Sequence, residues 1–232
     1  MLEKQEGNGL STKPGLVGGG RSRMTAGQRK AQIIDVTLRL VDKHGVQGTT
    51  TARIAAAAGV TEPTLYKYFE NRREMLMAAL DVVFDQAVDV VRSSQEPNVI
   101  ERLRKIGQHH TNLTFSKSSG FVNPLFEFVV APAELGLRSR GRARNVAIAE
   151  ALASMVKEGI AQGSIRADVD PQLTAWRVLG FYWFEDVSFL MDLDEVVTLG
   201  VSTDLLERVL ADIAVEPGSE ASDVVSEGER RG

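Results

Sequence analysis

The sequence predicts an all-α fold, and three observations lead to this prediction. Apolar residues recur at helical spacing along most of the 232 residues, and no segment sustains the alternation of apolar and polar residues that is typical of a half-buried strand. Capping residues and glycines stand where the periodic segments begin and end. The content of 43% apolar and 25% charged residues is that of an ordinary globular protein.

The composition divides the chain into four segments. Residues 1–24 are rich in Gly, Ser and Lys and predict a disordered basic arm. Residues 215–232 predict a disordered acidic tail, because they too can bury little apolar surface. Between them we expect a small helical domain at residues 25–72 and a larger helical domain at residues 73–214.

Two helices are predicted at the start of the small domain. The first runs over residues 26–44, and Gly45 is placed to end it. The second follows Thr49 and Thr50, either of which can cap it, and it ends before Gly59. Its run of four alanines lets another helix approach closely.

The segment TEPTLYKYF, residues 61–69, predicts a short third helix. Thr61 is expected to cap it with its side chain, and Pro63 lies in the first turn, where its missing N–H costs no hydrogen bond. Leu65 and Phe69, four residues apart, are expected to face inward. The residues expected to face outward are Thr64, Lys67 and Tyr68, with Tyr66 at the boundary.

A fourth helix is predicted to begin at Asn71, whose side chain can cap it. Arg72 and Arg73 follow at once, although basic residues at the positive end of a helix cost a few tenths to about 1 kcal/mol each. We therefore expect an anionic group near these two guanidinium groups.

Two short helices joined at Gly59, the second with exposed polar residues, form a helix-turn-helix, the unit whose second helix fits the major groove of DNA. The segment from Arg29 to Leu76 also resembles the DNA-binding domain of the tetracycline-repressor (TetR) family. The residues that carry this resemblance are Gly48, Thr49, Thr50, Ile54, Ala55, Ala58, Gly59, Val60, Pro63, Thr64, Leu65, Tyr66, Tyr68, Phe69 and Arg72. A weaker resemblance, to the junction between the seventh and eighth helices of these repressors, lies at residues 158–171.

The distribution of charge agrees with a DNA-binding front. Residues 12–73 contain eleven Lys and Arg against four Asp and Glu, a surplus of seven positive charges, although the whole chain has a net charge of -4. A basic module on an acidic body is typical of a protein that binds a polyanion with one domain only.

The resemblance implies contacts to phosphates and to base edges. Phosphate contacts are expected from Thr49, Thr50, Tyr68 and Arg72, which are all competent donors. The full set of expected DNA-binding residues is Thr49, Thr50, Arg53, Thr61, Glu62, Pro63, Thr64, Tyr66, Lys67, Tyr68 and Arg72.

Three of these expectations keep an alternative. Glu62 can accept a hydrogen bond from cytosine, or it can serve only the helix dipole. Arg53 can contact phosphate or stay solvated. The arm, with Lys13, Arg21 and Arg23, can reach a minor groove or remain a solvated tail.

The larger domain contains helices predicted near residues 73–93, 99–118, 121–134, 140–162 and 171–191, and a last one ending near residue 214. The helix at 171–191 is apolar on nearly every side and must be covered all round. One subunit can cover only part of it, and the resemblance likewise implies a homodimer. The expected dimer-interface residues are Leu179, Gly180, Val187, Leu206, Val209 and Leu210.

The resemblance further implies a pocket for a small effector among the middle helices. Aromatic residues with sparse polar groups are the usual lining of such a pocket, although core packing explains each aromatic equally simply. Glu127, in an apolar segment, needs a partner or a raised pKa, unless it faces water. The expected effector-binding residues are His109, Asn112, Phe115, Phe126, Glu127, Trp176 and Trp183.

The sequence thus predicts a DNA-binding transcriptional regulator, a homodimeric repressor released from a near-palindromic operator by a small, largely apolar effector. The alternatives are a sequence-indifferent DNA-binding protein and an all-α enzyme that uses His109 and His110. Enzyme motifs and cysteines are absent from the sequence, and we expect neither catalysis nor a cofactor or metal. No membrane-length apolar run or signal peptide is present, so a cytoplasmic location is expected.

Overall fold

The protein is described here by a computed structural model covering residues 24–116 and 120–215. Within these ranges the chain forms helices and turns. The described residues contain one isolated β-bridge, between Ile165 and Ala214, and no strand, so the all-α prediction is confirmed. The predicted arm and tail lie, except for Met24 and Val215, outside the described residues. The elements are α1 (Ala26–Gly48), α2 (Thr51–Ala58), α3 (Glu62–Leu65), α4 (Arg72–Arg92), α5 (Val99–Thr114), α6 (Val122–Val130), η1 (Ala133–Leu135), α7 (Leu137–Ala161), α8 (Pro171–Leu190), α9 (Glu195–Thr198) and α10 (Val201–Ile213).

The helices begin and end at the residues whose side chains favour this. Thr50, Asn71 and Asp170 are the N-caps of α2, α4 and α8, and each accepts a hydrogen bond from a backbone N–H of the first turn. Gly59 ends α2 in the left-handed conformation. Gly45 has φ 67° and ψ 172°, which breaks α1 and turns its last residues in a new direction.

Several elements differ from the prediction, among them α7, which begins at Leu137 instead of near residue 140. The helix expected at residues 121–134 is divided into α6 and η1, because Ala131 and Pro132 are extended and a proline disfavours helix at the residue before it. Helix α5 ends at Thr114, earlier than expected. The short helix α9 was not predicted.

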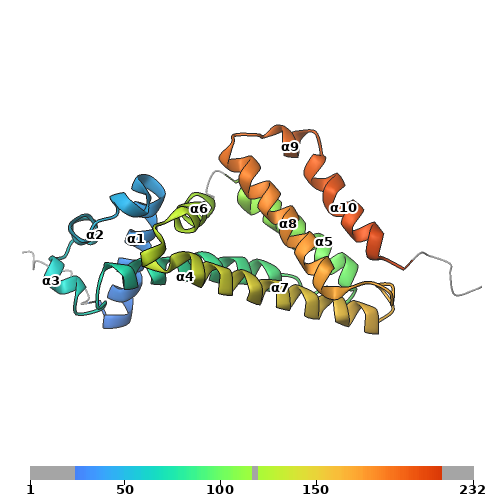
Figure 1. Cartoon of the computed structure of the whole chain (residues 1–232), viewed down its shortest axis with the longest axis horizontal. Coiled ribbons are helices and arrows are strands. Elements are labelled where there is room, and N and C mark those ends of the chain that lie inside the picture. The colour runs from blue at the N-terminus through green and yellow to red at the C-terminus, as the bar shows by residue number, and fades with distance from the viewer. Residues whose placement is uncertain (1–23, 117–119, 216–232) are drawn as a thin grey trace, which may run out of the picture.

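The apolar side chains form two clusters. The smaller cluster joins α1, α2, α3 and the beginning of α4, and its members are Ile33, Val36, Ile54, Ala55, Ala58, Leu65, Phe69 and Met75. The larger cluster spans α4 to α10 and also includes Val41 and Val46 of α1, so α1, like α4, takes part in both clusters. Figure 1 shows α1, α2 and α3 at one end of an elongated molecule, with α4 and α7 running along its length and α6 between the two ends. Helix α4 belongs to both clusters and therefore connects them.

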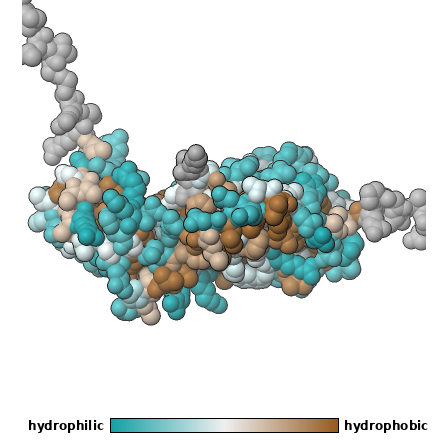
Figure 2. All heavy atoms as spheres, turned by 90° about the horizontal axis from the view of Figure 1, so that it is seen from above, coloured by the Kyte–Doolittle hydropathy of each residue, from teal (hydrophilic) through white to brown (hydrophobic). Residues whose placement is uncertain are grey.

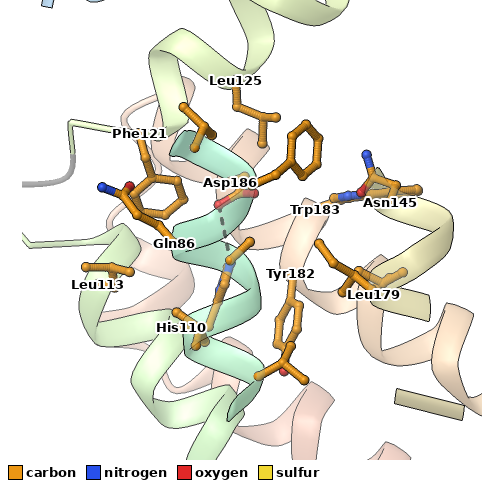
Figure 3. Close-up of a pocket in the computed structure, with 16 residues that line it drawn as sticks. Gln86, His110, Leu113, Phe121, Leu125, Asn145, Leu179, Tyr182, Trp183 and Asp186 are labelled. Carbon is orange, nitrogen blue, oxygen red and sulfur yellow. Dashed lines mark ion pairs between the residues drawn. The ribbon is translucent and has the colours of Figure 1, made fainter. Parts of the chain in front are cut away.

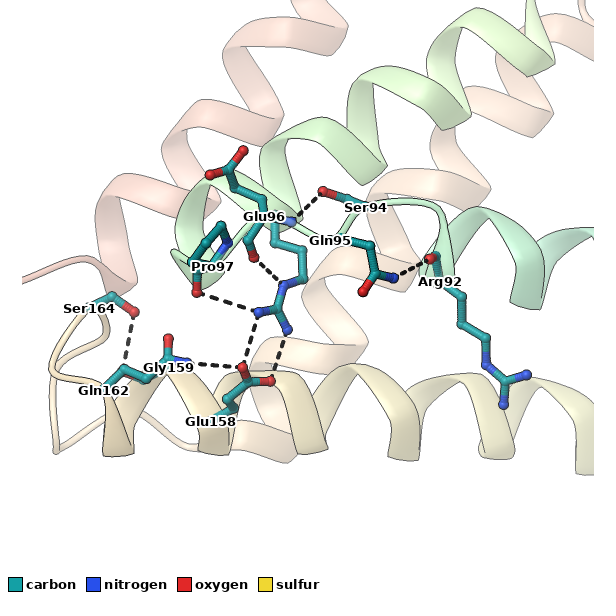
Figure 4. A network of polar contacts seen from close by, with 10 residues as sticks. Arg92, Ser94, Gln95, Glu96, Pro97, Glu158, Gly159, Gln162 and Ser164 are labelled. Atoms are coloured by element: carbon teal, nitrogen blue, oxygen red, sulfur yellow. Dashed lines mark hydrogen bonds and ion pairs between the residues drawn. The ribbon is translucent and has the colours of Figure 1, made fainter.

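Arg102 on α5 binds the end of the larger cluster that lies away from α1, α2 and α3. Its guanidinium donates to the backbone oxygen of Glu96 at 2.7 Å and to both carboxylate oxygens of Glu158 at 2.8 and 3.0 Å (Figure 4). This hydrogen bonding lowers the pKa of Glu158. The arrangement ties the loop between α4 and α5 to α7.

Candidate DNA interface and ligand site

The outer face of α3 is open to solvent and rests on a buried support. Pro63, Tyr66 and Lys67 are exposed, whereas Leu65 and Phe69 are buried in the smaller cluster. Glu62, Thr64 and Tyr68 are half-buried at the edges of this face. Leu65 and Phe69 thus face inward and Lys67 faces outward as predicted, whereas Tyr66, expected at the boundary, is exposed, and Tyr68, expected outward, packs half-buried against the smaller cluster.

Thr61 stands at the N-cap position of α3 but makes no side-chain cap, contrary to the prediction. Its hydroxyl instead lies 2.9 Å from the hydroxyl of Thr64. Both threonine side chains therefore share one hydrogen bond beside the exposed face of α3.

The residues around the start of α2 differ in availability. Thr50 is exposed, and Arg53 donates to the backbone oxygen of Gly48 at 2.8 Å while remaining exposed. Thr49 is fully buried, and its hydroxyl donates to the backbone oxygen of Gly45 at 2.8 Å. Its side chain is not available to a phosphate, which contradicts the expectation for Thr49.

Arg72 and Arg73 bind backbone oxygens. Arg72 donates through Nε to the oxygen of Thr49 at 2.6 Å and through a second nitrogen to the oxygen of Val46, and burial lowers its pKa. Arg73 donates through Nε to the oxygen of Leu135 at 2.8 Å. The carbonyls that end α1 thus carry a partial negative charge that Arg72 neutralises, and its expected contact to a phosphate stays a prediction.

Glu127 lies on α6 and binds the break in α1. Its Oε2 accepts the backbone N–H of Val46 at 3.0 Å. A Cβ added at Gly45 would lie only 2.7 Å from the same oxygen, so the two segments are in close contact. Of the two possibilities left by the sequence, Glu127 takes the first: it is half-buried and has a partner. That partner lies in α1, and the expected place among effector contacts is not supported.

An apolar groove of about 560 Å³ lies among α4, α6, α7 and α8, and we call it the outer groove. Of the expected effector residues, Phe126, Trp176 and Trp183 line it. Its other lining residues are Leu80, Phe84, Leu125, Phe128, Val129, Leu137, Arg138, Gly141, Arg142, Asn145, Val146 and Val187.

A second, more enclosed cavity of about 50 Å³ lies deeper in the same helices, and we call it the inner cavity (Figure 3). It shares Phe84, Leu125, Asn145 and Trp183 with the outer groove, so these four residues separate the two spaces. Its polar lining includes Gln86, His110, Tyr182 and Asp186.

The remaining expected effector residues lie elsewhere. His109 lines a different hollow, beside α1 and α4. Asn112 is exposed, and the ring of Phe115 packs edge-on against Phe189 with centroids 6.0 Å apart. His110, which lies outside the expected effector-binding set, lines the inner cavity.

A buried polar cluster borders the inner cavity. Glu185, which is completely buried, accepts from His110 Nδ1 at 2.7 Å, from Thr111 at 2.6 Å and from Ser202. Asp186 lies beside it on α8. Burial is the main cause that raises the pKa of Asp186, to about 6. Within the described residues no group of three or more His, Cys, Asp or Glu side chains could hold a metal ion.

Helix α8 exposes a stripe of apolar side chains along one side. The stripe consists of Leu173, Trp176, Trp183, Phe184, Val187 and Met191, and Figure 2 shows apolar surface gathered on the larger helical body. No described helix is both long and apolar enough to cross a membrane. Gly180 lies open on the same helix. Leu179, Leu206 and Leu210 are buried inside the chain, so they cannot form the expected dimer interface, and Val209 is half-buried.

A family model described as bacterial regulatory proteins of the tetR family matches residues 33–79, which contain α2 and α3, most of α1 and the beginning of α4. Over 83 residues the chain is 35% identical to the HTH-type transcriptional regulator TtgR of Pseudomonas putida. Residues 33–79 therefore carry the sequence pattern of the tetR family of bacterial regulatory proteins. The alignment covers 36% of this chain and 40% of TtgR, so it spans about two fifths of the length of that relative.

Solved structures show a likeness of fold that extends to the larger cluster of this chain. FadR from Bacillus subtilis in complex with stearoyl-CoA has a TM-score of 0.63 at 20% identity, over 78% of this chain and 97% of FadR. AibR in complex with isovaleryl coenzyme A and operator DNA has a TM-score of 0.52 at 29% identity, over 68% of this chain and 85% of AibR. The likeness in fold to these structures therefore extends over most of this chain.

The sequence analysis did not predict the two carboxylates of the polar cluster, Glu185 and Asp186. The signal was present in the pair Glu185 and Asp186, two adjacent acidic residues in a helix that is otherwise apolar on nearly every side. Such residues must find buried partners, but the sequence does not reveal that those partners lie on α5 and α10.

Proposed function

We propose that residues 25–72 form a DNA-binding domain, that residues 73–214 bind a small effector and a second subunit, and that the protein is a homodimeric repressor. The observation that supports this most directly is the exposed face of α3, with Pro63 and Lys67 held outward by the buried Leu65 and Phe69. A rigid helix that presents polar and apolar groups from a basic domain fits the major groove.

Different exposed residues of this domain are proposed to contact the bases and the phosphates of the DNA. Lys67 can donate to guanine acceptors, and Pro63 can contact a thymine methyl group. Thr50, Arg53 and Tyr68 remain our candidates for phosphate, since their side chains are accessible or at the edge of the face. Arg72 acts through the chain itself, by holding the end of α1 against the start of α4.

The apolar stripe on α8 is the proposed dimer interface. A helix face with two tryptophans and a phenylalanine in water is unfavourable, at about 25 cal/mol per Å² of apolar surface that a partner could cover. A dimer would place two α3 helices one turn of DNA apart, about 34–36 Å. Phe184→Glu should give monomers in sedimentation velocity, whereas Leu199→Glu, at a residue outside the stripe, should leave the dimer intact.

The outer groove is the proposed effector site. Its apolar lining and size suit a small molecule with a largely apolar body. The acyl-CoA ligands in the structures of FadR and AibR suggest one class of effector with such a body.

Effector binding would reach the DNA-binding domain through α6. Phe126 and Phe128 on α6 line the outer groove, and Glu127 between them binds Val46. An effector that moves α6 therefore acts on the end of α1 and on α2 beyond it. The effector must favour the released arrangement by a coupling free energy, and about 1–3 kcal/mol is usual.

Catalysis by the two adjacent histidines is not proposed. His110 is buried and bound to Glu185, whereas His109 is exposed in a different hollow, so their rings do not share a site. We propose instead that His110 serves the polar cluster.

Selection of DNA from a random pool, followed by fluorescence anisotropy at fixed salt, tests the proposed function. A specific regulator should bind the selected duplex at least about 10³-fold more tightly than random DNA. Equal affinity for both would support the alternative of a sequence-indifferent DNA-binding protein.

A further inference from the structure

The inner cavity is apolar except where a few polar side chains enter it. Figure 3 shows Asp186 near the middle of the lining residues, with His110 and Tyr182 on one side and Trp183 and Asn145 on another. The Asp186 side chain is almost completely buried, since only 3% of the residue's surface is exposed. A carboxylate therefore faces a closed, mainly apolar space.

The two carboxylates of the polar cluster are not equally satisfied. Glu185 accepts three hydrogen bonds and does not line the cavity. Asp186 has only longer contacts through Oδ1, to the hydroxyl of Thr114 at 3.3 Å and to Nε2 of His110 at 3.6 Å. Asp186 is thus the carboxylate with capacity to accept a further donor.

The charges around the cavity also leave Asp186 without full compensation. Among the described residues that line the inner cavity, His110 is the only one with a basic side chain, and it is shared with Glu185. Even a protonated His110 would leave one negative charge on the pair of carboxylates. Gln86 of α4 and Asn145 of α7 are neutral. A buried charge without a partner is costly, and either a proton or a ligand cation relieves the cost.

We propose that the effector carries a protonated amino group, which Asp186 binds in the inner cavity, while the apolar body of the effector lies in the outer groove. This proposal rests on the proposed ligand-responsive function. The two spaces are adjacent through Phe84, Leu125, Asn145 and Trp183. About 50 Å³ holds an amino group and its first methylenes, whereas the larger outer groove holds an apolar chain.

An effector with an anionic head group is the competing possibility, and the structure offers a place for it. Arg138 and Arg142 line the outer groove but not the inner cavity. An effector with an anionic head would place that head near these guanidinium groups and only apolar carbon near Asp186. Amine and carboxylate probes with the same alkyl chain therefore distinguish the two binding modes.

The test compares octylamine, octanoate and octanol on the full chain near neutral pH. The two tryptophans of the chain both line the outer groove, so their fluorescence reports binding. Octylamine should bind about tenfold or more tightly than octanol and octanoate, because only its ammonium group can form a charge-assisted hydrogen bond with Asp186. Equal or tighter binding of octanoate or octanol, or no binding of octylamine, overturns the proposal.

Asp186→Asn should remove the preference for octylamine, and Asp168→Asn, at an exposed aspartate, should keep it. Thermal unfolding shows whether the first variant is folded. A second measurement needs no variant: octylamine affinity should fall at about pH 5, where Asp186 is protonated, while octanol affinity stays constant. A preference that survives Asp186→Asn, or an octylamine affinity that does not change with pH, contradicts the inference.

Measuring DNA binding in the absence of any amine or carboxylate probe shows whether a failure concerns this inference or the proposed function. If the protein prefers no DNA sequence but still binds octylamine through Asp186, the regulator proposal fails and the amine site stands. If a selected duplex is bound and is released by octanoate but not by octylamine, the regulator proposal stands and the amine site fails.

Discussion

Glu127 Oε2 accepts the backbone N–H of Val46 at 3.0 Å, which joins α6 to the break in α1. The carbonyl oxygen of the same Val46 accepts from Arg72 at the start of α4. Val46 is thus bound by residues of α4 and α6, and both of these helices also contribute residues to the outer groove. Gly45 makes this possible, because its left-handed backbone turns Val46 toward α6 and leaves no side chain against the carboxylate.

Glu127→Ala should weaken the coupling between effector and DNA. It leaves the Val46 N–H without its acceptor, at a cost of about 1–3 kcal/mol, whereas Glu127→Gln keeps an acceptor oxygen and should change less. Anisotropy with and without effector measures the coupling. Glu134→Ala, at an exposed glutamate in η1, is the control. Unchanged effector response in Glu127→Ala would show that α6 does not act through this contact.

Lys67→Gln and Arg72→Gln should differ in their effect on the salt dependence of DNA binding. If Lys67 approaches the DNA and Arg72 binds only carbonyls, the slope of log affinity against log salt should change by about 1 for the first variant alone. Arg72→Gln should instead lower the melting temperature, because the oxygens of Val46 and Thr49 lose a donor. A lowered slope in Arg72→Gln with unchanged melting would restore Arg72 as a phosphate contact.

Gly159→Ala should destabilise the protein by about 1–3 kcal/mol. A Cβ at Gly159 of α7 would lie 2.6 Å from the side chain of Ile165 and 3.1 Å from Cβ of Val99, and the latter cannot move without its backbone. Gly27→Ala, where nothing lies within 4 Å, should be neutral or stabilising by helix propensity. Urea unfolding of both variants checks this, and equal stabilities would mean that α7 and α5 pack less closely.

The stability of the protein should depend on pH through Asp186. Its folded pKa of about 6 lies above the ordinary value of 3.8, so between these values the folded state binds the proton more tightly than the unfolded state. Stability is therefore lost as pH rises from about 4 to 6, on the order of 3 kcal/mol at most. Asp186→Asn removes this loss, although His110, Thr114 and Glu185 still face the site.

Urea unfolding at several pH values tests this dependence. Relative to the parent, Asp186→Asn should become more stable as pH rises from about 4 to about 6, and the difference should level off above that. Asp168→Asn, at an exposed position, should show no such trend. A difference between Asp186→Asn and the parent that is the same at every pH would contradict the expected titration.

The parts of the fold that depend on residues close together in the sequence were predictable. Thr50, Asn71 and Asp170 cap helices because each side chain meets an N–H two or three residues away. The inward position of Leu65 and Phe69 follows from helical spacing alone.

The errors concern contacts that only tertiary structure creates. Thr49 was expected at a phosphate from the family resemblance, but the break in α1 at Gly45 brings a backbone oxygen to its hydroxyl and buries it. Leu179 was assigned to the dimer interface because a helix that is apolar all round does not reveal which face its own chain covers. The partners of Glu127 and Asp186 lie about 70 to 80 residues away along the chain.

The anisotropy of a selected duplex with Thr64→Ala/Lys67→Ala tests the central claim, that the exposed face of α3 reads DNA. The account predicts that this folded, still dimeric double variant loses about 10-fold or more in affinity for the selected duplex, since each good base contact contributes about 1–3 kcal/mol. Lys157→Ala, at an exposed position on α7, should bind like the parent. Parent-like affinity of the double variant for the selected duplex would contradict the account.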